Sequence, residues 1–307
     1  MARKFLLVFL ALGILNSMSL TGSAEEKYIL IDTMINFNFN PGGFAMDPAG
    51  NFYVTDWFGC RILKYDANGQ FLKEWGQKGT ANGSFDRPSK IALDSDGNVY
   101  VVDTWNGRIQ RFDSDGTWKN TWTKAGSESF GTPTYVAVDS AHAIYAGGSK
   151  VLKFKPDGTL LKKYGASGSP YQPGDIILAQ SVVLDLNDNL YVGHYRFKNY
   201  ITKFKAFFGT VESEWEFESS PEAIALDLTD NIYATDGLYI YKLGPDGKLI
   251  TKWGEGRTQP VMTDVYVDIT VDPTGFVYVL KSGGQLLKYG RMKKIMRAPI
   301  NRIRILR

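Results

Sequence analysis

Six aspartates recur along the chain at intervals of 42 to 47 residues, and a tyrosine follows each of them six positions later. The aspartates are Asp47, Asp94, Asp139, Asp185, Asp227 and Asp272, and the tyrosines are Tyr53, Tyr100, Tyr145, Tyr191, Tyr233 and Tyr278. Self-similarity at a fixed period is typical of repeat architectures, in which each copy is one small unit that packs on its neighbours. The chain is therefore expected to fold as six similar units.

Each copy contains four short β-rich runs separated by turn residues. In the second copy the runs cover residues 90–94, 98–103, 108–113 and 117–122, and Asp-Ser-Asp-Gly joins the first pair and again the last pair. Asp and Gly tolerate the backbone angles that tight antiparallel turns need. A single four-stranded sheet cannot bury both of its faces, whereas a closed ring of such sheets can. We predict an all-β fold, a six-bladed β-propeller of four-stranded antiparallel blades.

The ring needs a strand to close it, because the sixth copy supplies its third strand at residues 285–289 but has no Gly-led fourth. A strand-like run at residues 28–35 precedes the first copy. We predict that this N-terminal strand forms the outer strand of the last blade. Residues 300–306 in the C-terminal tail are the alternative.

The two ends of the chain differ in character from its body. Residues 1–24 have a basic start, a short apolar run and small residues before Glu25, which is typical of a cleavable signal peptide. The propeller is expected to span residues 25–290, with 26 basic against 32 acidic side chains, and residues 291–307 form a basic tail without acidic residues. We expect a secreted or periplasmic protein whose tail is either solvated or in contact with an anionic surface.

The clearest copy resembles the NHL repeat. It reads Ile91-Ala-Leu-Asp, then Gly97-Asn-Val-Tyr-Val-Val-Asp, then Asn106-Gly-Arg-Ile-Gln-Arg-Phe. The first two copies match best, and each has an acidic and a basic residue five positions apart, which are Asp56 with Arg61 and Asp103 with Arg108. The resemblance implies a propeller. It implies less about activity, because the group includes protein-binding modules, RNA-binding modules and a few lyases.

One face of the ring is expected to be constant and the other variable. The connection between the first and second strands has one length in all six copies, whereas the loops between the second and third strands differ in length. We call the ends that carry these two sets the uniform face and the variable face. Loops on a rigid scaffold usually carry binding residues, so the variable face is the expected binding surface.

The residue three positions after each tyrosine of the repeat begins a variable loop. Asp56, Asp103 and Asp236 are expected to order their own loops, with Arg61 and Arg108 as partners in the first two blades. His194 and Lys281 break this column and are predicted to contact a ligand. Aromatic and cationic residues of the same loops, which are typical of binding hot spots, complete the set of candidates: Trp57, Phe58, Trp105, Tyr195, Arg196 and Phe197.

Catalytic motifs are not evident. The chain has one cysteine, Cys60, and two histidines, His142 and His194, and it has no Gly-x-Ser-x-Gly elbow or phosphate-binding loop. The lyases of the NHL group are known for a histidine-bound zinc, and two histidines are too few to build that site. We therefore expect no cofactor, with a calcium ion in the central channel as an open alternative.

The sequence thus favours a non-catalytic extracytoplasmic propeller that binds a protein, peptide or glycan on its variable face. Two alternatives remain open. One is a lyase or hydrolase that depends on a divalent metal and has its site at the central channel. The other is nucleic-acid binding, against which the acidic body and the export signal both argue.

Overall fold

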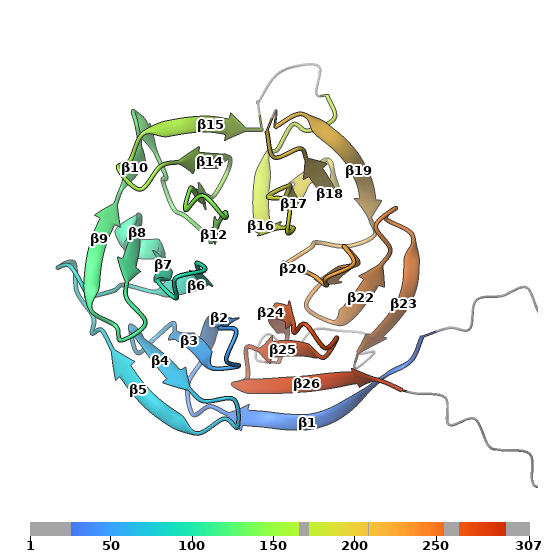
Figure 1. Cartoon of the computed structure of the whole chain (residues 1–307), viewed down its shortest axis with the longest axis horizontal. Helices are drawn as coiled ribbons and strands as arrows, with labels where there is room; N and C mark the ends of the chain where they lie inside the picture. Colours follow the sequence, from blue (N-terminus) through green and yellow to red (C-terminus); the bar gives the residue numbers. More distant parts are fainter. Residues whose placement is uncertain (1–25, 166–171, 208, 255–263, 293–307) are drawn as a thin grey trace, which may run out of the picture.

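A computed structural model describes residues 26–165, 172–207, 209–254 and 264–292. Within these ranges the strands form six four-stranded antiparallel sheets and one two-stranded ribbon. The six sheets stand around a central channel like the blades of a propeller, as Figure 1 shows. The only helical element among the described residues is the single 3-10 turn Thr104–Asn106. The predicted six-bladed propeller is confirmed.

Each blade begins with its inner strand at the channel and ends with its outer strand at the rim. In that order the blades are β2 (Pro41–Met46), β3 (Phe52–Asp56), β4 (Arg61–Tyr65) and β5 (Phe71–Trp75); β6 (Pro88–Leu93), β7 (Val99–Asp103), β8 (Arg108–Phe112) and β9 (Trp118–Trp122); β12 (Tyr135–Val138), β13 (Ile144–Gly147), β14 (Val151–Phe154) and β15 (Leu160–Tyr164); β16 (Leu178–Leu184), β17 (Leu190–Arg196), β18 (Lys198–Phe204) and β19 (Val211–Phe217); β20 (Ala223–Leu226), β21 (Ile232–Thr235), β22 (Tyr239–Leu243) and β23 (Leu249–Gly254); and β24 (Tyr266–Val271), β25 (Val277–Lys281), β26 (Gln285–Arg291) and β1 (Tyr28–Asn36). The ribbon consists of β10 (Lys124–Ala125) and β11 (Glu128–Ser129).

The repeated residues bond to one another within each blade. In the second blade Asp94 Oδ1 accepts the backbone amides of Asp96 at 3.0 Å and Asn98 at 2.8 Å, and its Oδ2 accepts the Tyr100 hydroxyl at 3.0 Å. Three other blades repeat the Tyr–Asp bond at 3.2 to 3.3 Å. The periodic Asp and Tyr therefore have a structural role, which is to fix the turn between the first two strands on the uniform face.

The last blade is closed by the N-terminal strand, as predicted. β1 pairs with β26 from Tyr28 opposite Arg291 to Asn36 opposite Gln285. The Tyr28 ring also stacks on Trp253 of the fifth blade, with ring centroids 4.3 Å apart. Figure 1 shows β1 and β26, from opposite ends of the described chain, side by side at the rim. The ring is thus held shut by backbone pairing between residues far apart in the sequence.

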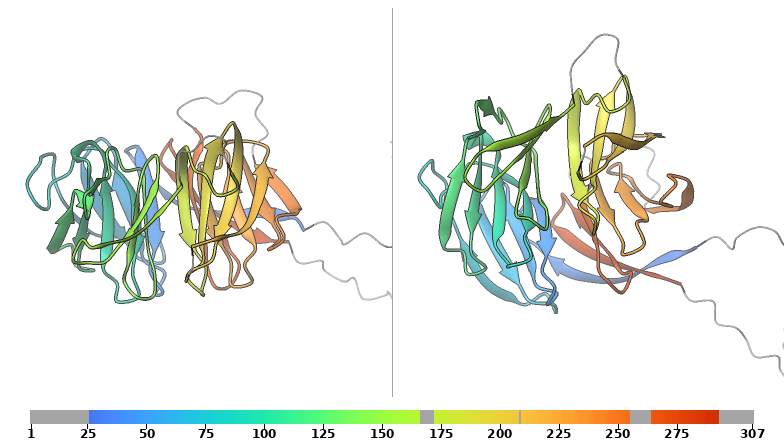
Figure 2. Two further views of the ribbon diagram at one scale, coloured as in Figure 1. Left: turned by 90° about the horizontal axis from the view of Figure 1, so that it is seen from above. Right: turned by 45° about the horizontal axis from the view of Figure 1, so that its top comes forward.

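The hydrophobic core lies between neighbouring blades. One cluster, for example, joins Tyr53 and Ile62 of the first blade to Val99 and Val101 of the second, all of them no more than 1% exposed. Figure 2 shows the blades standing upright around the channel, next to one another. Because burying one large apolar side chain stabilises a fold by about 1.5–3 kcal/mol, these interfaces make the ring a rigid platform for its loops.

Parts of the sequence interpretation lie outside the described residues. These are the predicted signal peptide, residues 1–24, and the basic tail from residue 293 onward. In the part of the chain that the structure describes, no helix has the length and apolar character needed to cross a membrane.

Candidate functional site

The mouth of the channel on the variable face is a cavity with several polar and charged side chains in its lining. The inner strands begin there, and residues at the start of these strands or just before them line a cavity of about 470 Å³ together with the loop at Asp236. The lining residues that come from the six blades include Gly42, Lys90, Thr134, Gln180, Glu222 and Val267. A volume of this size is typical of sites for small molecules.

A partly buried ion pair crosses one side of this mouth. Lys90 Nζ lies 3.0 Å from Asp268 Oδ1 and donates a hydrogen bond of 2.6 Å to the carbonyl oxygen of Val267. The other carboxylate oxygen, Asp268 Oδ2, accepts the backbone amide of Phe44 at 3.0 Å. Both side chains are less than 20% exposed. An ammonium group has three N–H donors, so two are used here and a third is left for a ligand.

The pair fits because the first blade has glycines between its two partners. Lys90 belongs to the second blade and Asp268 to the sixth, and the inner strand between them carries Gly42 and Gly43. A Cβ atom on Gly43 would lie 2.9 Å from Asp268 Oδ2 and 3.0 Å from Lys90 Cδ, which is too close. The missing side chains therefore provide the space that the lysine occupies.

Three more polar groups at the mouth are without partners in the described part of the chain. Thr134 Oγ1 and Gln180 Oε1 are buried atoms that make no hydrogen bond there, and Glu222 is exposed with no ion-pair partner for its carboxylate. Buried polar atoms are nearly always hydrogen-bonded, so orphaned ones call for an explanation. Here they offer hydrogen bonds to a molecule bound in the mouth.

Below the mouth, the channel is lined mostly by apolar side chains. It has a volume of about 320 Å³ and is lined mainly by Ala, Val, Ile and Leu side chains of the six inner strands. Lys90, Ser181 and Asp268 line its upper part, where it meets the mouth. The groups that can do chemistry are therefore gathered at the variable face.

The mouth does not fit a divalent metal ion. Both oxygens of Asp268 are occupied by Lys90 and Phe44. Asp236 uses its carboxylate for the amides of Leu238 and Tyr239 and for the Tyr241 hydroxyl, at 2.7 to 2.9 Å. Glu222 is then the one lining carboxylate in the described mouth that has no protein partner. Calcium takes six to eight oxygen ligands, so the oxygens left over while Lys90 Nζ binds Asp268 and the Val267 carbonyl are too few.

The two residues that break the loop column are buried. His194 is 0% exposed and its Nε2 is 2.8 Å from Thr202 Oγ1, while Lys281 is 3% exposed and pairs with Asp264 at 2.6 Å. Burial lowers the pKa of His194 to about 4, so the imidazole is neutral at pH 7. The structure thus does not present either residue to a ligand, because each points into its own blade and satisfies groups there.

The aspartates of the same column bind groups of their own loops. Arg61 Nε lies 3.1 Å from Asp56 Oδ2, and Arg108 Nε lies 2.6 Å from Asp103 Oδ2. Arg108 also donates to three carbonyl oxygens of residues 80–84. Asp236, as described above, binds the amides of its own loop. These groups order the variable loops.

The predicted aromatic residues form two separate groups. Trp57, Phe58 and Trp105 surround Arg87, whose Cζ is 4.1 Å from the Phe58 ring centroid and 4.9 Å from that of Trp105. Phe58 and Trp105 are more than 60% exposed. On the fourth blade Tyr195 and Phe197 are exposed as well. The sequence singled out the aromatics but not the arginine that gathers three of them.

Arg196, between Tyr195 and Phe197, is buried. Its Nη2 lies 2.5 Å from Glu214 Oε1, and its guanidinium group is 4.6 Å from the Tyr200 ring centroid. Burial on its own would raise the pKa of Glu214, but hydrogen bonds from Arg196, the Gly174 amide and Thr202 hold it below its usual value. Arg196 therefore stabilises the blade rather than facing a ligand.

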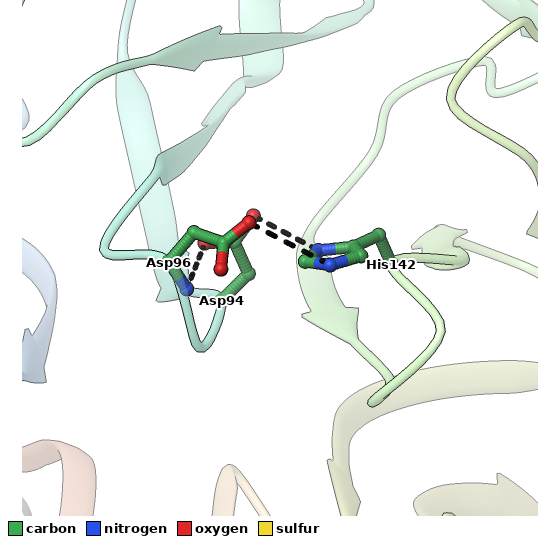
Figure 3. A group of neighbouring side chains, drawn as sticks. All are labelled: Asp94, Asp96 and His142. Carbon is green, nitrogen blue, oxygen red and sulfur yellow. Dashed lines mark hydrogen bonds and ion pairs between the residues drawn. The ribbon is translucent and has the colours of Figure 1, made fainter.

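A second cluster lies on the uniform face, between the second and third blades. Figure 3 shows the His142 ring facing the turn of Asp94 and Asp96, with Nδ1 3.5 Å from Asp94 Oδ2 and Nε2 3.6 Å from Asp96 Oδ2. Among the described residues this is the one group of His, Cys, Asp and Glu close enough to hold a metal ion. Asp94, however, already accepts four hydrogen bonds from its own blade. The cluster acts as a contact between two blades.

Sequence reasoning did not find Lys90, Glu222 and Asp268. A signal was present, because the position four residues before each repeat Asp reads Gly43, Lys90, Tyr135, Ser181, Ala223 and Asp268. Two opposite charges stand in a column that is otherwise neutral. That they pair with each other follows only from the ring, which brings the second and sixth blades to either side of the first.

The model of the NHL repeat family matches residues 85–112, most of the second blade. The structure is similar to a gluconolactonase from Xanthomonas campestris, at 15% identity and a TM-score of 0.66 over 87% of this chain and 90% of that one. It is also similar to a streptogramin B lyase, at 13% identity and a TM-score of 0.60 over 86% of this chain and 98% of that one. A virginiamycin B lyase from Staphylococcus aureus is similar at 12% identity and a TM-score of 0.62, over 87% of this chain and 100% of that one. No curated protein matches the chain.

These neighbours contradict the prediction of a non-catalytic binding propeller, because the three solved proteins named above are enzymes. That prediction was wrong because it took the lack of local catalytic motifs as a sign against catalysis. A propeller places single residues from separate strands together at its channel, so its site has no motif in the sequence. At these identities the likeness establishes the shared fold.

Proposed function

We propose that the protein is an enzyme that hydrolyses a small lactone or related ester at the channel mouth on the variable face. The observation that carries the proposal is the Lys90–Asp268 pair, a fixed positive charge with a free N–H in a cavity of about 470 Å³. The Xanthomonas campestris neighbour, a gluconolactonase, supports the choice of substrate class.

The residues of the mouth divide the chemistry between them. The Lys90 ammonium donates to the carbonyl oxygen of the substrate, where negative charge develops in the transition state. Glu222 takes a proton from a water molecule while the water oxygen bonds to the carbonyl carbon of the substrate. Glu222 then gives this proton to the ring oxygen of the lactone as the ester C–O bond breaks. Asp268 holds Lys90 in position. Thr134 and Gln180 bind hydroxyl groups of the substrate.

Elimination is the second candidate, because two of the neighbours are lyases. A base next to a cation also suits removal of a proton beside a carbonyl group, since the lysine would stabilise the enolate oxygen. The products separate the two reactions. Hydrolysis incorporates one oxygen atom from water, whereas elimination gives a carbon–carbon double bond and no such oxygen.

The proposal is tested by the hydrolysis of five- and six-membered lactones at constant pH. We expect Lys90→Met and Glu222→Gln each to lower kcat/KM by about 100-fold or more, because both remove groups that act on the transition state. Lys248→Met is the matched control, because Lys248 pairs with Asp246 in the same way, at 2.7 Å, but is 85% exposed at the side chain and lies away from the mouth. Turnover that none of the mouth variants changes would refute the site.

A further inference from the structure

At the channel mouth, two oxygen atoms that could bind a metal ion are bound by the ammonium group of Lys90. The carbonyl oxygen of Val267 and the carboxylate of Asp268 are ligands of the kind that calcium prefers. Both are bound by Lys90 Nζ, at 2.6 Å and 3.0 Å. The ammonium group thus lies where these oxygens would otherwise bind a metal ion.

The surrounding backbone is built around this lysine. Gly43 leaves room for it, as shown above, and the first blade is tied to the second beside it. Thr55, which is fully buried, accepts the Gly43 amide at 2.9 Å and donates to the Ser89 carbonyl at 2.6 Å. Ser89 immediately precedes Lys90, so the start of the lysine's strand is anchored on the blade that the side chain crosses.

The local charges agree with this arrangement. In the described part of the chain, the carboxylates that line the mouth and the channel are those of Asp268, which pairs with Lys90, Glu222 on the fifth blade, and Asp236, which is engaged with its own loop. With Lys90 present, one positive charge opposes two negative ones. Without it, two carboxylates and a backbone carbonyl would face an aqueous cavity with no positive charge to balance them.

We propose that Lys90 replaces a divalent metal ion as the cation of the channel, so that the protein binds no calcium there and a single substitution turns the mouth into a calcium site. The inference deepens the proposed function, because it assigns the positive charge of the same site. It does not require that the protein hydrolyse lactones, since it concerns cation binding alone.

The test is calorimetric titration of Ca²⁺ into the wild type, Lys90→Ala and Lys90→Ala/Asp268→Asn. We expect no heat that depends on Asp268 in the wild type, and one ion bound by Lys90→Ala with a Kd in roughly the millimolar range of weak sites. The double variant is expected to lose that ion. Thermal unfolding is the second readout, and Ca²⁺ should raise the Tm of Lys90→Ala but not that of the wild type.

Two results would overturn the inference. One is stoichiometric Ca²⁺ binding by the wild type that Asp268→Asn abolishes, because the channel would then hold a metal beside the lysine. The other is a folded Lys90→Ala protein with no Ca²⁺ binding. If Lys90→Ala does not fold, Lys90→Met and the wild-type titration with and without Asp268→Asn decide the question. Wild-type binding that survives Asp268→Asn lies elsewhere and agrees with the inference.

Failure of this inference can be told from failure of the proposed function. A protein that binds no Ca²⁺ in the channel but hydrolyses no lactone keeps Lys90 as the cation and refutes the reaction. A protein whose lactone hydrolysis is abolished by a chelator, and restored by Ca²⁺ through Asp268, keeps the reaction and refutes the role of the lysine.

Discussion

At the scale of single residues, the repeat Asp, the repeat Tyr and a lysine of the third strand contact one another in most blades. The repeat Asp binds the turn and, in four blades, the tyrosine hydroxyl. A lysine of the third strand lies 4.8 to 5.4 Å from the tyrosine ring centroid in five blades. These residues are periodic because they hold the blade together. Lys90 and Asp268, to which we assign function, are the two charged residues in a column that is otherwise neutral.

His194 should make stability depend on pH. Its folded-state pKa is lowered by burial from 6.5 to about 4. Between these values the unfolded chain binds a proton that the folded protein does not, so the free energy of unfolding falls as the pH falls through this window. The loss should approach about 3 kcal/mol near pH 4. Urea unfolding from pH 7 to pH 4 should show a weaker pH dependence for His194→Gln than for the wild type.

The control for this prediction is His142→Gln, the other histidine, which is 37% exposed at the side chain. Its pH dependence is expected to stay closer to that of the wild type. If His194→Gln and the wild type lose stability in parallel over the whole range, His194 is not a buried neutral group and the packing described for the fourth blade is wrong.

At the scale of elements, the strand that closes the ring comes from the other end of the chain. β1 pairs with β26 along most of its length and adds the Tyr28–Trp253 stack and the Lys242–Glu26 ion pair, at 2.8 Å. A chain that begins at Phe37 should therefore lose several kcal/mol of stability relative to one that begins at Glu25, with a drop in Tm of about 10 °C or more. Equal melting temperatures would mean that the last blade is stable with three strands.

The strands were predictable because each copy repeats the same pattern of turn residues and β-rich runs. Turn residues separate the β-rich runs of each copy into strands. A further β-rich run at residues 28–35, before the first copy, forms the closing strand. The site was not predictable in the same way. His194 and Lys281 attract notice as exceptions, but whether a side chain faces solvent or the blade depends on packing, and both are buried.

At the scale of the whole molecule, closure of the ring creates the site. Lys90 and Asp268 are 178 positions apart in the sequence, and β2 of the first blade packs between their strands. The charged side chains gather at one end of a channel whose other lining side chains are mainly Ala, Val, Ile and Leu. We therefore place function at the axis of the ring. The exposed aromatic group lies at a different place, around Arg87 just before β6.

A crystal structure of the protein with a six-membered lactam, the amide analogue of a lactone that resists hydrolysis, tests this claim most directly. We expect the lactam in the channel mouth, with its carbonyl oxygen within hydrogen-bond distance of Lys90 Nζ and its ring beside Glu222. A lactam bound instead at the Arg87 aromatic group, or beside His142 on the uniform face, with the channel mouth left to water, would contradict it.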